Sequence, residues 1–173
     1  MEDEIREIFS NITETYVEPI KLGSNCESNI YYRVEDLRVK DLALCASYLK
    51  ERILDNCAST RPEILVSMKT NFTELADKLA EELALDGKAL EVVDLEKVEQ
   101  GNGVRNVLRG KSVVLINDVI TTGKTCLEAH NNTTLMGGIV HCWAALIDRT
   151  FGPGPVPVAA CFTGSPITLV SRY

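Results

Sequence analysis

Histidine is scarce in this chain, and the cysteines show no metal-binding pattern. The only histidines are His130 and His141, and none of the six cysteines forms a Cys-x-x-Cys pair. Structural zinc sites and redox-active dithiols normally show such spacings. The sequence therefore gives no support to either kind of site, and we expect the cysteines to be free thiols, several of them buried.

Long apolar runs and an excess of positive charge are also missing. No stretch of about 18 apolar residues occurs, and the acidic start at Met1–Ile5 is not followed by a leader-like segment. The formal net charge is −7, with 45% apolar and 25% charged residues. This balance is ordinary for a globular protein and argues against general binding to nucleic acid or to an anionic membrane. We expect one cytoplasmic domain spanning residues 1–173.

The most informative segment is Val113–Thr125, which reads Val-Val-Leu-Ile-Asn-Asp-Val-Ile-Thr-Thr-Gly-Lys-Thr. Its apolar start predicts a buried strand, and its Thr/Gly turn leads into a helix that begins near Cys126. At such a junction, backbone N–H groups and the helix dipole point at an anion, and threonine hydroxyls add donors. Asn117 and Asp118 lie one step back and suit a polyol or a Mg²⁺-bound diphosphate. The segment therefore predicts a sugar-phosphate site.

The end of the segment, Gly123-Lys124-Thr125, also resembles the end of a Walker A loop. That loop requires a glycine five residues before its Gly-Lys pair, and Asp118 occupies this position. A carboxylate there would repel the β- and γ-phosphates of a nucleotide. We therefore reject an NTPase interpretation.

Apolar periodicity predicts alternating helices and strands along the chain. Helices are predicted at residues 4–17, 41–54, 73–83 and 123–135, strands at 30–34, 63–67, 89–93, 111–117, 139–147 and 158–162, and an edge strand at 167–170. Nearly continuous apolar strands that alternate with helices indicate a parallel α/β sheet. Ligands of such sheets bind at the carboxyl ends of the strands.

Val113–Thr125 resembles the 5-phosphoribosyl-1-diphosphate (PRPP) motif of type I phosphoribosyltransferases, and the whole chain is most similar to their orotate branch. The resemblance implies an α/β fold with a central, mostly parallel sheet flanked by helices. It also implies a small N-terminal hood at about residues 1–36 and a PRPP-binding core at about 37–173. The implied reaction joins orotate to PRPP and gives orotidine 5′-monophosphate and pyrophosphate, with Mg²⁺ as cofactor and a homodimer as the assembly.

The resemblance also assigns the site residues. The PRPP motif supplies Asn117, Asp118, Thr121, Thr122, Gly123, Lys124 and Thr125, and Asp118 meets the metal through PRPP and water. The pyrophosphate loop is Ser67, Met68, Lys69, Thr70 and Asn71. The base is held by Lys21, Tyr31, Tyr32 and Arg149, with the arginine directed at the orotate carboxylate. Catalytic roles fall to Asp118, Lys69 and Lys97.

The sequence departs from the family pattern at several positions. Asn117 replaces an acid, the pyrophosphate loop lacks the usual glycines, and the region expected to form a basic catalytic loop holds only Lys97, Arg105 and Arg109 among three acids. Three functions therefore stay open. The chain is an orotate phosphoribosyltransferase, a catalytically weakened PRPP-binding sensor or regulatory protein, or a phosphoribosyltransferase for another nucleobase.

Structural explanations also compete with some of the functional assignments. Tyr31 and Tyr32 would equally suit a strand that packs the hood on the core. Arg149 would equally suit a solvated ion pair with Asp148, and residues 67–72 an ordinary strand-to-helix loop.

Overall fold

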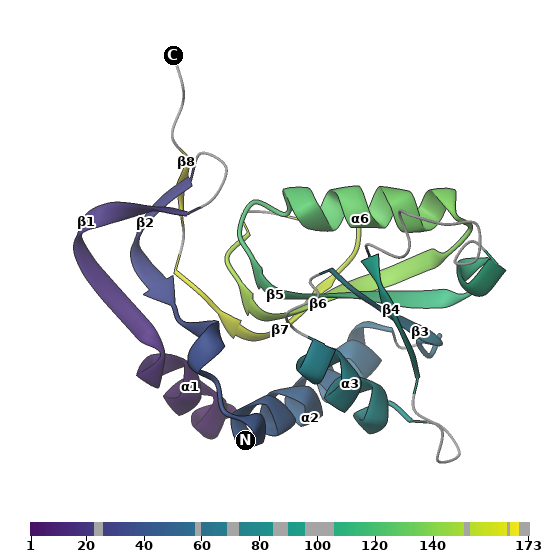
Figure 1. Ribbon diagram of the computed structural model, residues 1–173, viewed down its shortest axis with the longest axis horizontal. Helices are drawn as coiled ribbons and strands as arrows, with labels where there is room; N and C mark the ends of the chain where they lie inside the picture. Colours follow the sequence, from purple (N-terminus) through teal and green to yellow (C-terminus); the bar gives the residue numbers. More distant parts are fainter. Residues whose placement is uncertain are drawn as a thin grey trace.

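The chain forms a five-stranded parallel sheet and a smaller three-stranded antiparallel sheet (Figure 1). The computed structural model describes residues 1–22, 26–57, 60–68, 73–84, 90–95, 106–150, 153–165 and 167–169. The predicted α/β class with a parallel central sheet is confirmed.

The parallel sheet is the centre of the core. Its strands are β3 (Ile64–Ser67), β4 (Glu91–Asp94), β5 (Ser112–Ile120), β6 (Ile139–Asp148) and β7 (Val158–Thr163), in the order β4-β3-β5-β6-β7. β5 and β6 are buried along most of their length, as expected of central strands covered on both faces. β5 continues three residues beyond the predicted end at Asn117, because Ile120 still pairs with Asp148 of β6.

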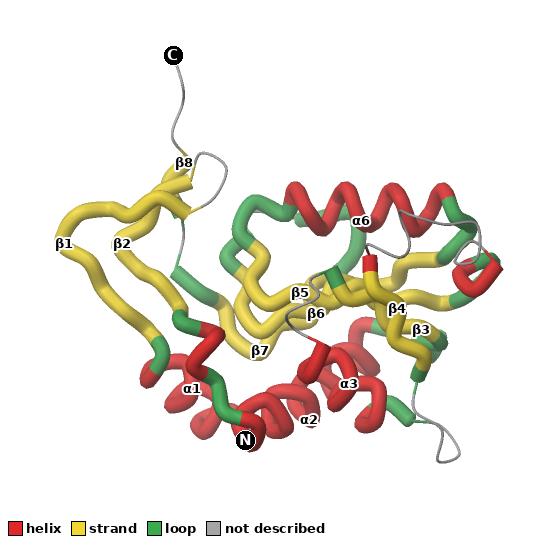
Figure 2. Tube along the Cα trace, in the orientation of Figure 1, coloured by secondary structure: helices red, strands yellow, loops and turns green. Residues whose placement is uncertain are grey.

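Helices cover both faces of this sheet (Figure 2). One face is covered by α1 (Glu2–Asn11), α2 (Val39–Asn56) and α3 (Thr73–Glu82), and the other by α6 (Lys124–Leu135). Each layer has its own apolar cluster, with Leu49 and Leu79 on the three-helix side and Cys126 and Trp143 on the side of α6. Among the described helices, none has the length and apolar character needed to cross a membrane.

We use the name hood below for the smaller, antiparallel sheet alone. It consists of β1 (Thr13–Leu22), β2 (Cys26–Tyr32) and β8 (Thr168–Leu169), with β2 in the middle. The edge strand predicted at residues 167–170 therefore joins the hood, since β8 pairs with β2 and not with the parallel sheet. The predicted helix at 4–17 was too long, because α1 ends at Asn11 and the β-branched and aromatic residues that follow pair with β2.

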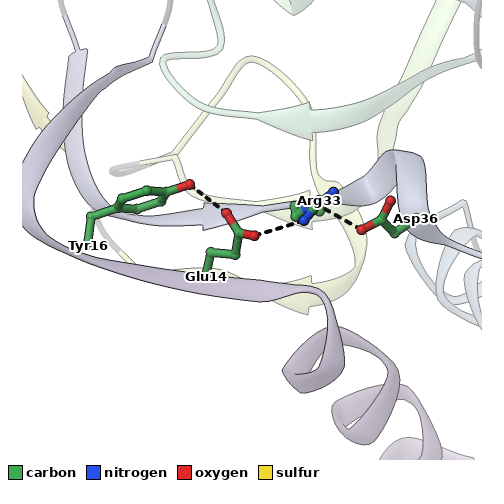
Figure 3. A network of polar contacts seen from close by, with 4 residues as sticks. All are labelled: Glu14, Tyr16, Arg33 and Asp36. Carbon is green, nitrogen blue, oxygen red and sulfur yellow. Dashed lines mark hydrogen bonds and ion pairs between the residues drawn. The ribbon is translucent and has the colours of Figure 1, made fainter.

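A polar network ties the hood to the start of the core (Figure 3). Arg33 donates to Glu14 of β1 at 2.9 Å and forms an ion pair with Asp36 at 2.9 Å, and the Tyr16 hydroxyl donates to the second oxygen of Glu14. The hydrogen bonds from Tyr16 and Arg33 lower the pKa of the Glu14 carboxyl. These side chains are exposed or nearly so, so the network fixes the direction of the chain more than it adds stability.

Candidate functional site

A cavity of ≈ 410 Å³ lies where β5 and β6 end, between the core and the hood. Its walls are Lys21, Leu22, Tyr31, Tyr32, Val34, Asn117, Asp118, Val119, Thr121, Thr125 and Arg149. The volume falls in the range of small-molecule sites, and the position is the one that ligands of parallel α/β sheets occupy. The fold thus brings together predicted site residues from both ends of the sequence.

One end of the cavity is built by Asn117 and Asp118 of β5, which are both 7% exposed. The Asn117 side-chain oxygen accepts from the Asp118 backbone N–H at 3.0 Å, and an Asp118 carboxylate oxygen accepts from the Val119 N–H at 2.7 Å. These bonds fix both side chains against their own strand. Asp118 therefore presents a carboxylate of defined position to whatever fills the cavity, and Asn117 presents an amide without charge.

The turn after β5 separates two cavities. Thr121 and Thr125 line the cavity described above, whereas Thr122, Gly123 and Lys124 line a neighbouring cavity of ≈ 390 Å³. Gly123 caps the start of α6 in the left-handed conformation, with φ of 73°, which a residue with a side chain adopts at a cost. The turn therefore delivers the amino end of α6, with its positive dipole, to the edge of the first cavity.

The opposite end is built around Arg149, which follows β6 and is only 3% exposed. Its guanidinium donates to the Ser165 carbonyl at 2.7 Å, the Ile30 carbonyl at 3.2 Å and the Ser28 hydroxyl at 2.6 Å. Burial lowers the pKa of this guanidinium from its ordinary value. Arg149 is thus no solvated surface residue, and it joins the hood strand β2 to the segment after β7.

Tyr32 takes part in the same junction. Its ring lies 5.3 Å below the Arg149 guanidinium, and its hydroxyl accepts from the Ser165 N–H at 2.9 Å. Gly164 makes room for both, because a Cβ there would lie 2.8 Å from Arg149 Cγ and 3.2 Å from Tyr32 Cε2. Tyr32 therefore packs the hood on the core, and Tyr31, which also lines the cavity, is half-buried.

The sequence alone did not identify Ser28, Gly164 and Ser165 as part of this junction. Ser28 lies more than one hundred residues from Gly164 and Ser165 along the chain, and it reaches Arg149 across a separation of 121 residues. No spacing or motif connects such positions. They come together only because β8 pairs with β2 and because β6 pairs with β7 in the parallel sheet.

The remaining predicted residues either lie outside the described part of the chain or are placed away from the cavity. Lys69, Thr70, Asn71 and Lys97 lie outside the described residues. Ser67 and Met68 are buried, with exposures of 2% and 8%, and stand outside the lining. The sequence analysis placed Arg109 with Lys97 in the region expected to form a basic catalytic loop. In the structure Arg109 lies near the amino end of β5 and beside Gly137, where an added Cβ would lie 3.4 Å from Arg109 Cγ. It is therefore at the opposite edge of the sheet.

The cavity suits a divalent cation that arrives with its ligand. The described residues include no group of three or more histidine, cysteine, aspartate or glutamate side chains that would hold a metal by themselves. Asp118 is the single carboxylate among the residues that line the cavity. One or two carboxylates together with substrate phosphates are the usual ligands of protein-bound Mg²⁺. Asp118 therefore fits Mg²⁺ held chiefly by a diphosphate.

All six cysteines are buried thiols, and the sequence predicted burial for several of them. Cys126, in the first turn of α6, lies behind the cavity with its sulfur 4.0 Å from the Asn117 side-chain nitrogen. Burial raises the pKa of this thiol to about 12. At neutral pH the thiol is therefore protonated, and it supports Asn117 without acting as a nucleophile.

Comparison with known proteins relates the chain to two kinds of protein. No protein-family model matches the sequence. A curated relative, the transcriptional regulator GfcR 1 of Methanosarcina barkeri, is 30% identical over 132 residues, which span 70% of this chain. The match covers 61% of the length of that relative, so it extends over less than two thirds of the regulator.

The solved structures most relevant to the fold are orotate phosphoribosyltransferases. The enzyme from Aeropyrum pernix has a TM-score of 0.65 at 20% identity, and the match covers 94% of this chain and 92% of the enzyme. The enzyme from Mycobacterium tuberculosis has a TM-score of 0.62 at 16% identity, and the match covers 94% of this chain and 95% of the enzyme. At such low sequence identity the structural similarity shows the fold alone, and the predicted fold class is confirmed.

Proposed function

Because this chain has the type I phosphoribosyltransferase fold, we propose that it joins PRPP to a carboxylated pyrimidine, orotate, giving orotidine 5′-monophosphate and pyrophosphate. The observation that carries this proposal is the cavity with two unlike ends. One end has an anion-binding turn and Asp118, and the other has the buried cation Arg149. A molecule with a phosphate at one end and a carboxylate at the other matches this arrangement of charge.

The turn end would hold the 5-phosphoribosyl group. Thr121 and Thr125 would donate hydroxyl hydrogen bonds to the 5′-phosphate, together with N–H groups at the start of α6. Asp118 and Asn117 would accept from the ribose hydroxyls. Asp118 would also meet Mg²⁺, which neutralises charge on the departing diphosphate when it is bound.

The other end would hold the base. A carboxylate on the pyrimidine would accept hydrogen bonds from the Arg149 guanidinium, which already lines the cavity with fixed orientation. Lys21 adds a second positive charge on the rim, and Tyr31 offers a flat apolar surface to the ring. The homodimer implied by the resemblance is part of this proposal.

The transfer needs no nucleophile from the protein. A ring nitrogen of the base forms a bond to the anomeric carbon while the bond from that carbon to the diphosphate oxygen breaks, and the nitrogen loses its proton. Catalysis then consists of holding the two substrates in line and stabilising the negative charge that develops on pyrophosphate. Lys69 and Lys97 remain the residues we predict for the latter role.

A second candidate is a PRPP-binding regulatory protein with little or no turnover. The observation that favours it is the 30% identity to a transcriptional regulator. The neutral Asn117 in place of an acid and the remote position of Arg109 agree with weakened catalysis. Both candidates use the same cavity, so they differ in chemistry and not in the site.

Calorimetric titration with PRPP and Mg²⁺, followed by a panel of nucleobases and analysis of products, separates the candidates. Binding of PRPP with orotidine 5′-monophosphate as product supports the enzyme, and another nucleotide as product would correct the base. Binding without turnover on any base favours the regulator. Glu63→Gln, at the opposite edge of the sheet beside Lys111, is a control that should bind PRPP normally. No binding of PRPP would refute both.

A further inference from the structure

The turn after β5 lies between the two cavities. Thr121 and Thr125 line the ≈ 410 Å³ cavity, and Thr122, Gly123 and Lys124 line the ≈ 390 Å³ cavity. A Cβ placed on Gly123 would lie 3.6 Å from Cζ3 of Trp143 and 3.9 Å from Cγ2 of Thr150. Because Gly123 has no Cβ, these distances show that an indole edge and a methyl group face the glycine across a gap that a methyl group would fill.

Trp143 is held rigidly in this position. It is 3% exposed on β6, its backbone N–H donates to the Pro157 carbonyl at 3.0 Å, and its ring packs edge-on against His130 of α6 at 6.3 Å. Gly154 closes the other side, because a Cβ there would lie 3.4 Å from Trp143 Cζ3. The same ring atom thus faces both Gly123 and Gly154, and Trp143 also lines the ≈ 390 Å³ cavity.

Thr150 is held in place by hydrogen bonds to Asp148. Its backbone N–H and its hydroxyl both donate to one carboxylate oxygen of Asp148, at 2.9 and 2.7 Å. With the hydroxyl committed to Asp148, the methyl group is the part that faces Gly123. Arg149 lies between these two residues and points to the hood instead. The segment 148–150 therefore supports the turn on one side and builds the base end on the other.

We propose that Trp143 and Thr150 are positioning residues that hold the anion-binding turn in place and thereby set the affinity for PRPP. This inference rests on the proposed function. Neither residue lines the cavity that would hold PRPP. They act through Gly123, because a shift of the turn would move its hydrogen-bond donors away from the phosphate, and hydrogen bonds weaken steeply outside their normal distance and angle.

The test compares three variants of the full chain in calorimetric titrations with PRPP and Mg²⁺, with inorganic phosphate, and with orotate. Trp143→Phe withdraws the outer ring edge from Gly123, and Thr150→Ser removes only the methyl while keeping both bonds to Asp148. Val140→Ala is the control, since Val140 lies on the same strand and in the same apolar cluster but pairs with Val113, far from the turn. Thermal melting gives the stability of each variant.

We expect Trp143→Phe to weaken PRPP and phosphate binding about tenfold, or about 1.4 kcal/mol, and Thr150→Ser about threefold. Orotate affinity should stay within about twofold, and Val140→Ala should lower the melting temperature without changing PRPP affinity. If Trp143→Phe lowers only the melting temperature, as the control does, Trp143 is a core residue and the inference is wrong while the proposed function stands. Should Trp143→Phe not fold, unchanged PRPP binding by Thr150→Ser would refute the inference. A wild-type chain that binds neither PRPP nor phosphate would refute both proposals.

Discussion

The two ends of the cavity are built in different ways. The end that we propose for the phosphate, called the phosphate end below, comes from one continuous segment, in which Asn117, Asp118 and the turn to α6 follow one another along the chain. The base end is assembled from separate segments, because Arg149 is bonded to Ser28 and Ile30 of the hood and to Ser165 near the end of the chain. A local strand–turn–helix unit therefore faces a junction between two sheets.

This difference has consequences for stability as well as for binding. The phosphate end depends on the backbone of β5 and α6, which belong to the parallel core. The base end exists only while the hood is docked on that core. Changes at the base end should therefore disturb the docking of the hood together with binding of the base, whereas changes at the phosphate end should affect binding alone.

The largest effect is expected for Arg149→Ala. Removal of the guanidinium leaves the buried Ser28 hydroxyl and two carbonyls without this donor, which should destabilise the fold by about 3 kcal/mol. Orotate binding should be lost, and PRPP binding should persist in the fraction that is folded. Denaturant unfolding and two separate titrations measure this. Equal loss of both ligands in a folded variant would contradict the division into two ends.

Asp118→Asn tests the phosphate end. The amide oxygen can keep the bond from the Val119 N–H, so the fold should be retained, but the charge that meets the ribose hydroxyls and Mg²⁺ is removed. We expect PRPP affinity to fall by about 2 kcal/mol, or about 30-fold, with little change in melting temperature. Titrations with PRPP and with orotate check the result, and unchanged PRPP affinity would show that the pocket assignment is wrong.

Gly164→Ala crowds the base end without removing any bond. The new Cβ would lie 2.8 Å from Arg149 Cγ and from Ile147 Cγ2, which should cost about 1–3 kcal/mol and shift the guanidinium. Orotate affinity should fall more than PRPP affinity. The matched control is Gly110→Ala, where φ is +73° but nothing lies within 4 Å, so that only backbone strain is added. If both variants change orotate affinity equally, crowding at Arg149 is not the cause.

The smallest effect concerns acid stability and should leave the comparison of the two ends unchanged. Asp41, at the start of α2, accepts from the Arg38 guanidinium at 2.7 Å and from its backbone N–H at 3.2 Å, and this pairing lowers the pKa of the Asp41 carboxyl from 3.8. The pairing therefore contributes about 1 kcal/mol to the free energy of unfolding, and this contribution is fully present above pH 3.8. It is lost as the pH falls through the lower pKa that Asp41 has in the folded state. The difference in melting temperature between wild type and Asp41→Asn should shrink on acidification. A constant difference down to pH 3 would contradict this assignment.

The sequence predicted the strand, turn and helix of the phosphate end because the information for them is local, and their role in binding phosphate stays a prediction. A buried strand, a Gly/Thr turn and a helix start within Val113–Thr125 were enough to place the turn at the carboxyl end of β5. The same kind of reasoning made α1 too long, since Ile12 and Tyr16 continue its apolar spacing although strand pairing with β2 prevails there. The base end could not be predicted in full, because its contacts depend on which strands become neighbours.

The central claim is that one cavity holds a phosphate at its turn and a carboxylate at Arg149. A crystal structure of the protein with orotidine 5′-monophosphate tests this most directly. We predict the phosphate within hydrogen-bond distance of Thr121 and Thr125, the ribose hydroxyls at Asp118, and the carboxylate at the Arg149 guanidinium. A nucleotide bound in the reverse direction, or bound outside this cavity, would contradict the account.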